Sequence, residues 1–202
     1  MTGAPDFCEP VVGWRLWSIG SEDGHARLAS HVSPAVWQPG RELVAACSAR
    51  RRDLRRPWRT HPTDHAAPAP GCTCGVHAMA AVGALSTYLP APDRPYAWMR
   101  PLVRQAIGRV ALWGEVVEGS RGWRASRAYP AEVWLPQLDI DGNDIAGVEE
   151  IALDLADYGV PVRVCDGRTG RDVVSDLSPR GTADRPAQPR PRSGGRGSSS
   201  RW

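Results

Sequence analysis

The stretch GRVALWGEVVEGSRGWRASRAY, residues 108–129, decides the fold. Its first half alternates, with Val110 and Leu112 among the apolar residues that share one face. Apolar and aromatic residues at a period of two are typical of a β-strand. The segment at residues 119–122 begins and ends with glycine, as hairpin turns often do. We therefore predict a hairpin whose second strand ends at Pro130.

A second hairpin is predicted toward the N-terminus. Residues 11–19 alternate imperfectly, and residues 20–24, which read GSEDG, form a cluster of turn residues. Residues 25–32 then return as the partner strand. A short apolar segment at residues 41–47 is predicted to add a strand that ends at Cys47.

Two principal helices are predicted. Residues 76–89 are rich in alanine, carry apolar side chains at helical spacing and end before Pro90. Residues 147–158 form an amphipathic pattern, and the glycine that follows suits a helix C-terminus. A strand over residues 160–165 comes next. The predicted fold class is α+β, with a mixed, mainly antiparallel sheet built from hairpins.

The chain of 202 residues has room for one domain and a small appendage. We expect a flexible N-terminus over residues 1–10 and a single globular domain over 11–177. Within this domain, residues 48–71 are predicted to form a long Arg/Pro-rich loop. Residues 178–202 consist mainly of Arg, Pro, Gly and Ser, which leave almost nothing to bury, so we expect a disordered tail.

Composition indicates in which compartment the protein lies and which classes of partner it does not favour. The net charge of +3 is too small to indicate a nucleic-acid partner by itself. No stretch approaches the roughly 20 apolar residues that span a bilayer, and the first residues lack a signal-peptide pattern. We therefore expect a cytoplasmic protein that does not contact membranes. Five cysteines, an odd number, favour free thiols or metal ligands over disulfides.

Cysteines and histidines gather in one part of the sequence. The cluster comprises Cys47, His61, His65, Cys72, Cys74 and His77. Four such residues can complete a tetrahedral zinc site with mixed sulfur and nitrogen ligands. A bound metal would also stabilise a Pro-rich loop that has little apolar surface. Our candidate ligands for Zn²⁺ are Cys47, His65, Cys72 and Cys74.

Two other interpretations of this cluster stay open. Cys74 stands directly before a predicted helix, where the helix dipole favours a thiolate. His65 or His77 would then act as its base and Cys72 as a resolving thiol, which describes a thiol-dependent enzyme or redox protein. The third interpretation is that the cysteines are small buried apolar residues without chemistry.

Two further patterns suggest binding surfaces. Trp113, Arg124 and Tyr129 fall in the predicted hairpin and would suit a stacking surface, although the tryptophans also suit a core. The arginine-rich run at residues 50–59 contains Trp58 and suggests contact with nucleic-acid phosphates. We expect such contact to be weak at most, and we prefer the interpretation of this run as a solvated loop.

A resemblance follows from two blocks of sequence. Residues 65–78 read HAAPAPGCTCGVHA, and residues 108–118 read GRVALWGEVVE, followed by GWRA at 122–125 and AYP at 128–130. Together they resemble a family of small bacterial proteins with an H-x-A-P-x-x-x-C-x-C-G-(I/V)-x-A block and a V-x-L-W-G-x-V-V-E block. The resemblance covers roughly residues 11–165. That family has no established activity, so it implies a shared fold and a shared site.

The sequence lacks the common nucleotide-binding and hydrolase motifs, and it has no paired carboxylates that would indicate a hydrolase. Our first hypothesis is a non-enzymatic binding or regulatory module with a zinc site, acting on a protein or small-molecule partner. The alternative from another class is a thiol-dependent enzyme or redox protein that uses Cys74. A weaker alternative is a nucleic-acid-associated accessory protein.

Overall fold

The computed structural model describes residues 9–31, 35–47, 65–69, 71–89 and 104–179. Its strands are β1 (Val11–Glu22), β2 (His25–Ser30), β3 (Leu43–Val44), β4 (Val76–Met79), β5 (Gln105–Gly119), β6 (Gly122–Pro136) and β7 (Val162–Cys165). Its helices are the 3-10 helix η1 (Val82–Thr87) and the α-helices α1 (Val148–Ala156) and α2 (Gly170–Leu177). The predicted loop 48–71 and tail 178–202 lie largely outside the described residues.

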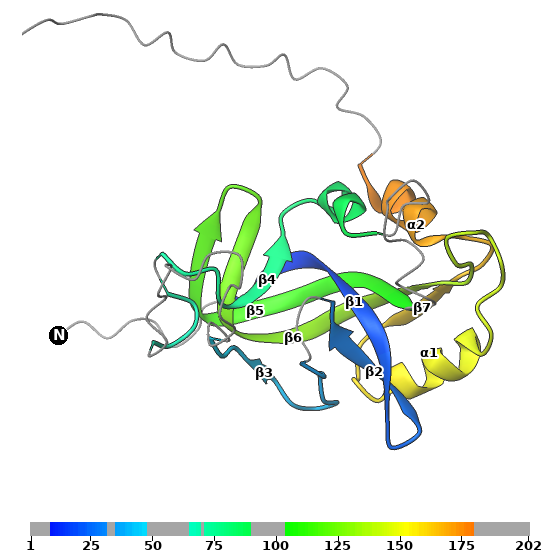
Figure 1. The fold of residues 1–202 in the computed structure, drawn as a ribbon, viewed down its shortest axis with the longest axis horizontal. Coiled ribbons are helices and arrows are strands. Elements are labelled where there is room, and N and C mark those ends of the chain that lie inside the picture. The colour runs from blue at the N-terminus through cyan, green and yellow to red at the C-terminus, as the bar shows by residue number, and fades with distance from the viewer. Residues whose placement is uncertain (1–8, 32–34, 48–64, 70, 90–103, 180–202) are drawn as a thin grey trace, which may run out of the picture.

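The seven strands form one mixed sheet, and β6 and β7 make its parallel pair. The long β5–β6 hairpin crosses the whole molecule (Figure 1). β1 pairs with β5, β5 with β6, β6 with β4, and β4 with β1, so four antiparallel strands form a closed circuit. The predicted α+β class with a mainly antiparallel sheet is confirmed, as are both predicted hairpins.

The central hairpin contains two irregularities that the sequence marks. The register of β5 on β6 shifts between Trp113 and Val116, where Gly114 has a φ of 75°. A Cβ atom at Gly114 would lie 2.3 Å from Ser126 Oγ, so a glycine is required there. The predicted end at Pro130 is wrong, because β6 continues to Pro136. A second register shift lies beside Pro130, between Arg109 and Val110 of the partner strand. This shift accommodates the amide donor that proline lacks.

The predicted helix over residues 76–89 is wrong in its first half, where β4 forms instead. β4 closes the circuit of strands, and its neighbours must approach unusually closely. A Cβ atom at Gly13 of β1 would lie 2.7 Å from the Cβ atom of Ala78. The small side chains that look like helix formers in the sequence are therefore needed for the close approach of strands. The second half of this segment forms η1, a 3-10 helix.

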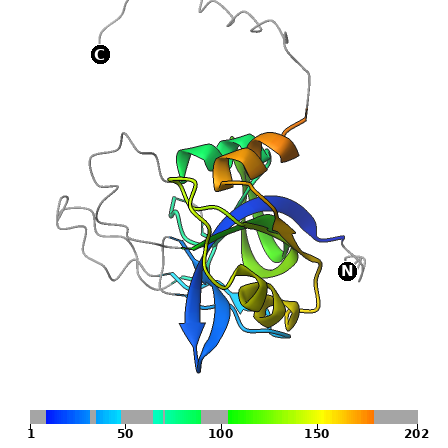
Figure 2. The same ribbon diagram turned by 90° about the vertical axis from the view of Figure 1, so that its right-hand side faces the viewer.

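Helices cover the sheet on opposite sides, as Figure 2 shows, and they define two clusters of buried residues. The larger cluster lies against α1 and includes Trp17, Leu112 and Leu155. The smaller cluster lies under η1 and α2 and includes Leu16 and Ile107. The predicted helix at 147–158 is confirmed as α1, and the strand at 160–165 as β7.

Helix α2 was not predicted from the sequence. A reciprocal capping box begins it, in which Thr169 accepts from the Asp172 amide and the Asp172 carboxylate accepts from the Thr169 amide. Among the described residues, no helix is long and apolar enough to cross a membrane.

Candidate metal centre

The candidate centre lies where two short strands meet on one edge of β6. Leu43 and Val44 of β3 pair opposite Ala128 and Arg127, and the Ala45 amide donates to the Ser126 carbonyl. The next position of β6 is occupied by β4, which begins with Val76 opposite Ala125. β3 and β4 thus follow one another along the same side of β6, and β4 pairs with β1 on its other side. The chain leaves β6 after β3 and returns to it at β4.

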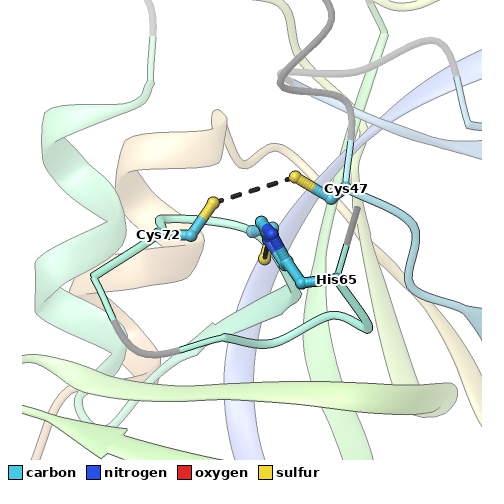
Figure 3. A group of neighbouring side chains, drawn as sticks. Cys47, His65 and Cys72 are labelled. Carbon is cyan, nitrogen blue, oxygen red and sulfur yellow. Dashed lines mark hydrogen bonds between the residues drawn. The ribbon is translucent and has the colours of Figure 1, made fainter. Parts of the chain in front are cut away.

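The cysteines stand at this junction. Cys47 follows β3, while Cys72 and Cys74 precede β4. With His65 they form a group whose ligand atoms all lie within 4.8 Å of one another, an arrangement that can hold a metal ion. The Cys47 and Cys72 side chains point toward each other, beside the His65 ring (Figure 3). All four predicted ligands are therefore brought together, and His61 lies outside the described residues.

Two of the distances within the group fit metal coordination. The sulfurs of Cys47 and Cys72 lie 3.8 Å apart, and His65 Nε2 lies 3.4 Å from the sulfur of Cys74. A disulfide bond would bring two sulfurs to about 2.05 Å, so the four described cysteines are free. Tetrahedral zinc with ordinary bond lengths would separate two sulfurs by about 3.8 Å and a sulfur and a nitrogen by about 3.5 Å.

The three carbonyl groups of the Cys72-Thr73-Cys74 turn are held from the neighbouring strands. Arg124 of β6 donates through Nη1 to the carbonyl oxygens of Cys72 and Cys74. His77 of β4 donates through Nε2 to the carbonyl oxygen of Thr73, at 2.8 Å. His77 is therefore a neighbour of the group and not one of its ligands. Burial lowers the pKa of His77, as do the charges of Arg15 and Arg124, whereas the contact with Thr73 raises it.

The two cysteines of the turn have different acidities. The backbone amide of Cys74 lowers the pKa of Cys72 to about 7, with smaller contributions from the side chains of Cys74, His65 and Cys47. Burial raises the pKa of Cys74, and the neighbouring Cys72 raises it further. Without a bound cation, the first thiolate of the turn is therefore that of Cys72.

The thiol-enzyme interpretation loses one of its supports. It requires a helix to begin directly after Cys74, so that the helix dipole lowers the pKa of that thiol. The residues that follow form β4 instead, and the pKa of Cys74 is raised. The prediction of a helix dipole at Cys74 is wrong, because the segment pairs with β6.

Gly75 connects the turn to β4. Its φ of 118° is unfavourable for any other residue. A Cβ atom there would lie 3.1 Å from that of Arg124 and 3.2 Å from that of Pro68. The glycine after the second cysteine thus allows β6 and the preceding loop to pack closely on the turn.

The residues predicted as a stacking surface make separate contacts. Arg124 contacts the cysteine turn, as described above. The Tyr129 hydroxyl accepts from the Gly40 amide and donates to the Tyr158 carbonyl, two residues after the end of α1. Trp113 is half-buried beside the bulge at Gly114. The cation–π contact that the structure describes joins Arg15 to Trp37. The arginine-rich run at 50–59 lies outside the described residues.

The fold and the site together define an α+β protein with a cluster of three cysteines and one histidine that can hold a metal ion. Comparison with family models, curated proteins and solved structures finds no match to this chain.

Proposed function

We propose that this protein is a non-enzymatic binding or regulatory module whose fold is completed by Zn²⁺ at Cys47, His65, Cys72 and Cys74. The observation that carries the proposal is the convergence of four ligand atoms from two distant segments within 4.8 Å. Its partner is a protein or a small molecule.

The set of donor atoms supports zinc. Thiolate sulfur and imidazole nitrogen are the ligands of structural zinc sites, whereas Mg²⁺ and Ca²⁺ prefer oxygen. Four protein ligands complete a tetrahedron and leave no position for a water or a substrate. A site closed in this way stabilises structure, which supports a binding module over a metalloenzyme.

The position of the group supports a structural role. Cys47 lies three residues after β3, and Cys72 and Cys74 lie just before β4, the next strand along the same side of β6. One ion bound to all of them would hold β3 and β4 in line along β6. It would also hold the two ends of the intervening segment together, as zinc does in small domains with little core.

Elemental analysis of protein purified under reducing, chelator-free conditions tests the proposal. We expect about one zinc per chain, and its loss when Cys47, Cys72 or Cys74 is changed to serine. Cys165→Ser is the matched control, because Cys165 is a free cysteine at the end of β7 and lies outside the cluster. A zinc content near zero, with no cobalt binding on titration, would exclude the metal site.

A thiol-dependent activity at Cys74 is the second candidate, and one observation favours it. His65 Nε2 lies 3.4 Å from the sulfur of Cys74, which is near hydrogen-bond reach for a general base. Alkylation by iodoacetamide separates the two candidates. A catalytic thiol predicts rapid alkylation of Cys74 that His65→Ala slows, whereas a zinc site predicts protection of all three cysteines by added Zn²⁺.

A further inference from the structure

We propose that Arg124 and His77 are positioning residues of the metal centre. They hold the carbonyl groups of the Cys72-Thr73-Cys74 turn, and this fixes the direction in which both sulfurs point. The inference rests on the proposed function, since it assigns the outer contacts of the same zinc site. Neither residue supplies a ligand atom.

Arg124 spans the turn from one side. Its Nη1 atom donates to the carbonyl of Cys72 and, at 2.9 Å, to that of Cys74. Two carbonyls held by one guanidinium nitrogen must face the same way. The geometry of the turn therefore depends on a side chain that is about fifty residues away in sequence and is fixed by the pairing of β6 with β4.

His77 holds the carbonyl of Thr73, which lies between the carbonyls of Cys72 and Cys74. Since the Thr73 carbonyl can only accept, Nε2 of His77 carries the proton, which fixes the tautomer of the ring. The backbone of His77 is itself held, because its carbonyl accepts from Nη1 of Arg15. Arg15 in turn stacks over the buried Trp37 and donates to Ser30. These contacts connect the cysteine turn to the core.

Charge gives Arg124 a second role. Zn²⁺ with three thiolates and one neutral imidazole carries a net charge of −1, which is costly in a partly buried site. The guanidinium of Arg124 is a cationic group that bonds to the turn. It would offset the negative charge of the loaded centre. Outer contacts of this kind typically change metal affinity by about 10–100-fold when they are removed.

Zinc affinity, measured by competition with a chromogenic chelator, tests the inference. We expect Arg124→Met and His77→Ala each to weaken binding by about 10–100-fold. His77→Gln retains an N–H donor and should restore part of the affinity. Arg127→Met is the matched control, because Arg127 lies on the same strand and its guanidinium forms an ion pair with Glu42. It should bind zinc as the unmodified protein does.

A spectroscopic readout separates positioning from general stability. In cobalt-loaded protein, displaced sulfurs should alter the d–d and thiolate charge-transfer bands of Arg124→Met but not those of Arg127→Met. If Arg124→Met does not fold, His77→Ala and His77→Gln supply the same comparison. Unchanged affinity and spectra in the folded variants would overturn the inference while leaving the zinc site intact. Failure of the unmodified protein to bind zinc or cobalt would instead overturn the proposed function.

Discussion

Replacing Gly75 by alanine should destabilise the protein strongly, because this glycine combines an unusual backbone conformation with close packing. Its φ of 118° lies outside the regions that alanine readily adopts. The added methyl group would lie 3.1 Å from the Cβ atom of Arg124 and 3.2 Å from that of Pro68. Both neighbours are near the backbone, so neither can move away without shifting the chain.

The expected cost has two parts. Backbone strain at such a position costs about 3 kcal/mol. Insertion of a methyl group into a packed site adds about 1 kcal/mol or more. Gly71→Ala is the matched control, because Gly71 has a φ of 73° but no atom of the described residues lies within 4 Å of its missing Cβ. Alanine at this left-handed position should cost only about 1–2 kcal/mol.

Thermal unfolding of the two variants measures the difference. For a chain of this size, about 1 kcal/mol corresponds to a shift of about 2–4 °C in Tm. The Gly75 variant should therefore melt about 4–12 °C below the Gly71 variant. Equal melting temperatures would refute the reasoning, since they would mean that the chain at residue 75 relaxes without cost.

Three other changes test the rest of the fold. Leu112→Ala removes a fully buried side chain and should lower the free energy of unfolding by about 2–5 kcal/mol in urea titrations. Tyr158→Phe leaves a buried amide and a carbonyl without their partner, which should cost about 1–3 kcal/mol by the same measurement. Contacts with Thr169 lower the pKa of Asp172, so its contribution to stability is present above the ordinary carboxyl pKa and is lost as pH falls through the lowered value. The acid dependence of Tm should be shallower in Asp172→Asn, and an unchanged dependence would contradict the assignment.

The hairpins could be predicted because their information is local. Alternation along residues 108–118 and a glycine-bounded turn specify two paired strands without reference to the rest of the chain. Helix α1 has an equally local signal in its amphipathic pattern. The capping box at Thr169 and Asp172 was a local signal too, and it could have revealed α2.

The error at residues 76–79 has a non-local cause. Alanine favours helix where nothing else decides, but here small side chains are needed where β4 crosses β1 beside Gly13. The pairing partner of β4 lies nearly fifty residues away in β6. Tertiary contacts therefore overrode local propensity, and no window around Val76 contains the information that decides its structure.

The candidate ligands could be predicted from residue type and proximity in sequence, and the structure brings Cys47, His65, Cys72 and Cys74 together. The contacts of Arg124 and His77 with the turn could not be predicted in the same way. They depend on the register of β6 against β4, which places these two side chains opposite each other. A stacking role for Arg124 was the natural expectation from its place beside Trp123 in the sequence.

The place of the metal group explains why a metal would be useful at this point of the sheet. Along the edge of β6, Ala45 could be followed directly by Val76, yet about 30 residues (46–75) separate them. Closing a loop of this length costs about 3 kcal/mol in chain entropy. The pairing of β3 and β4 with β6 must offset this entropy. Both strands are short, since β3 spans Leu43–Val44 and β4 spans Val76–Met79. Structural zinc sites contribute about 10–16 kcal/mol in small peptides, several times the cost of closing the loop. An ion at the junction would therefore let β3 and β4 remain in line along β6 in spite of the long segment between them.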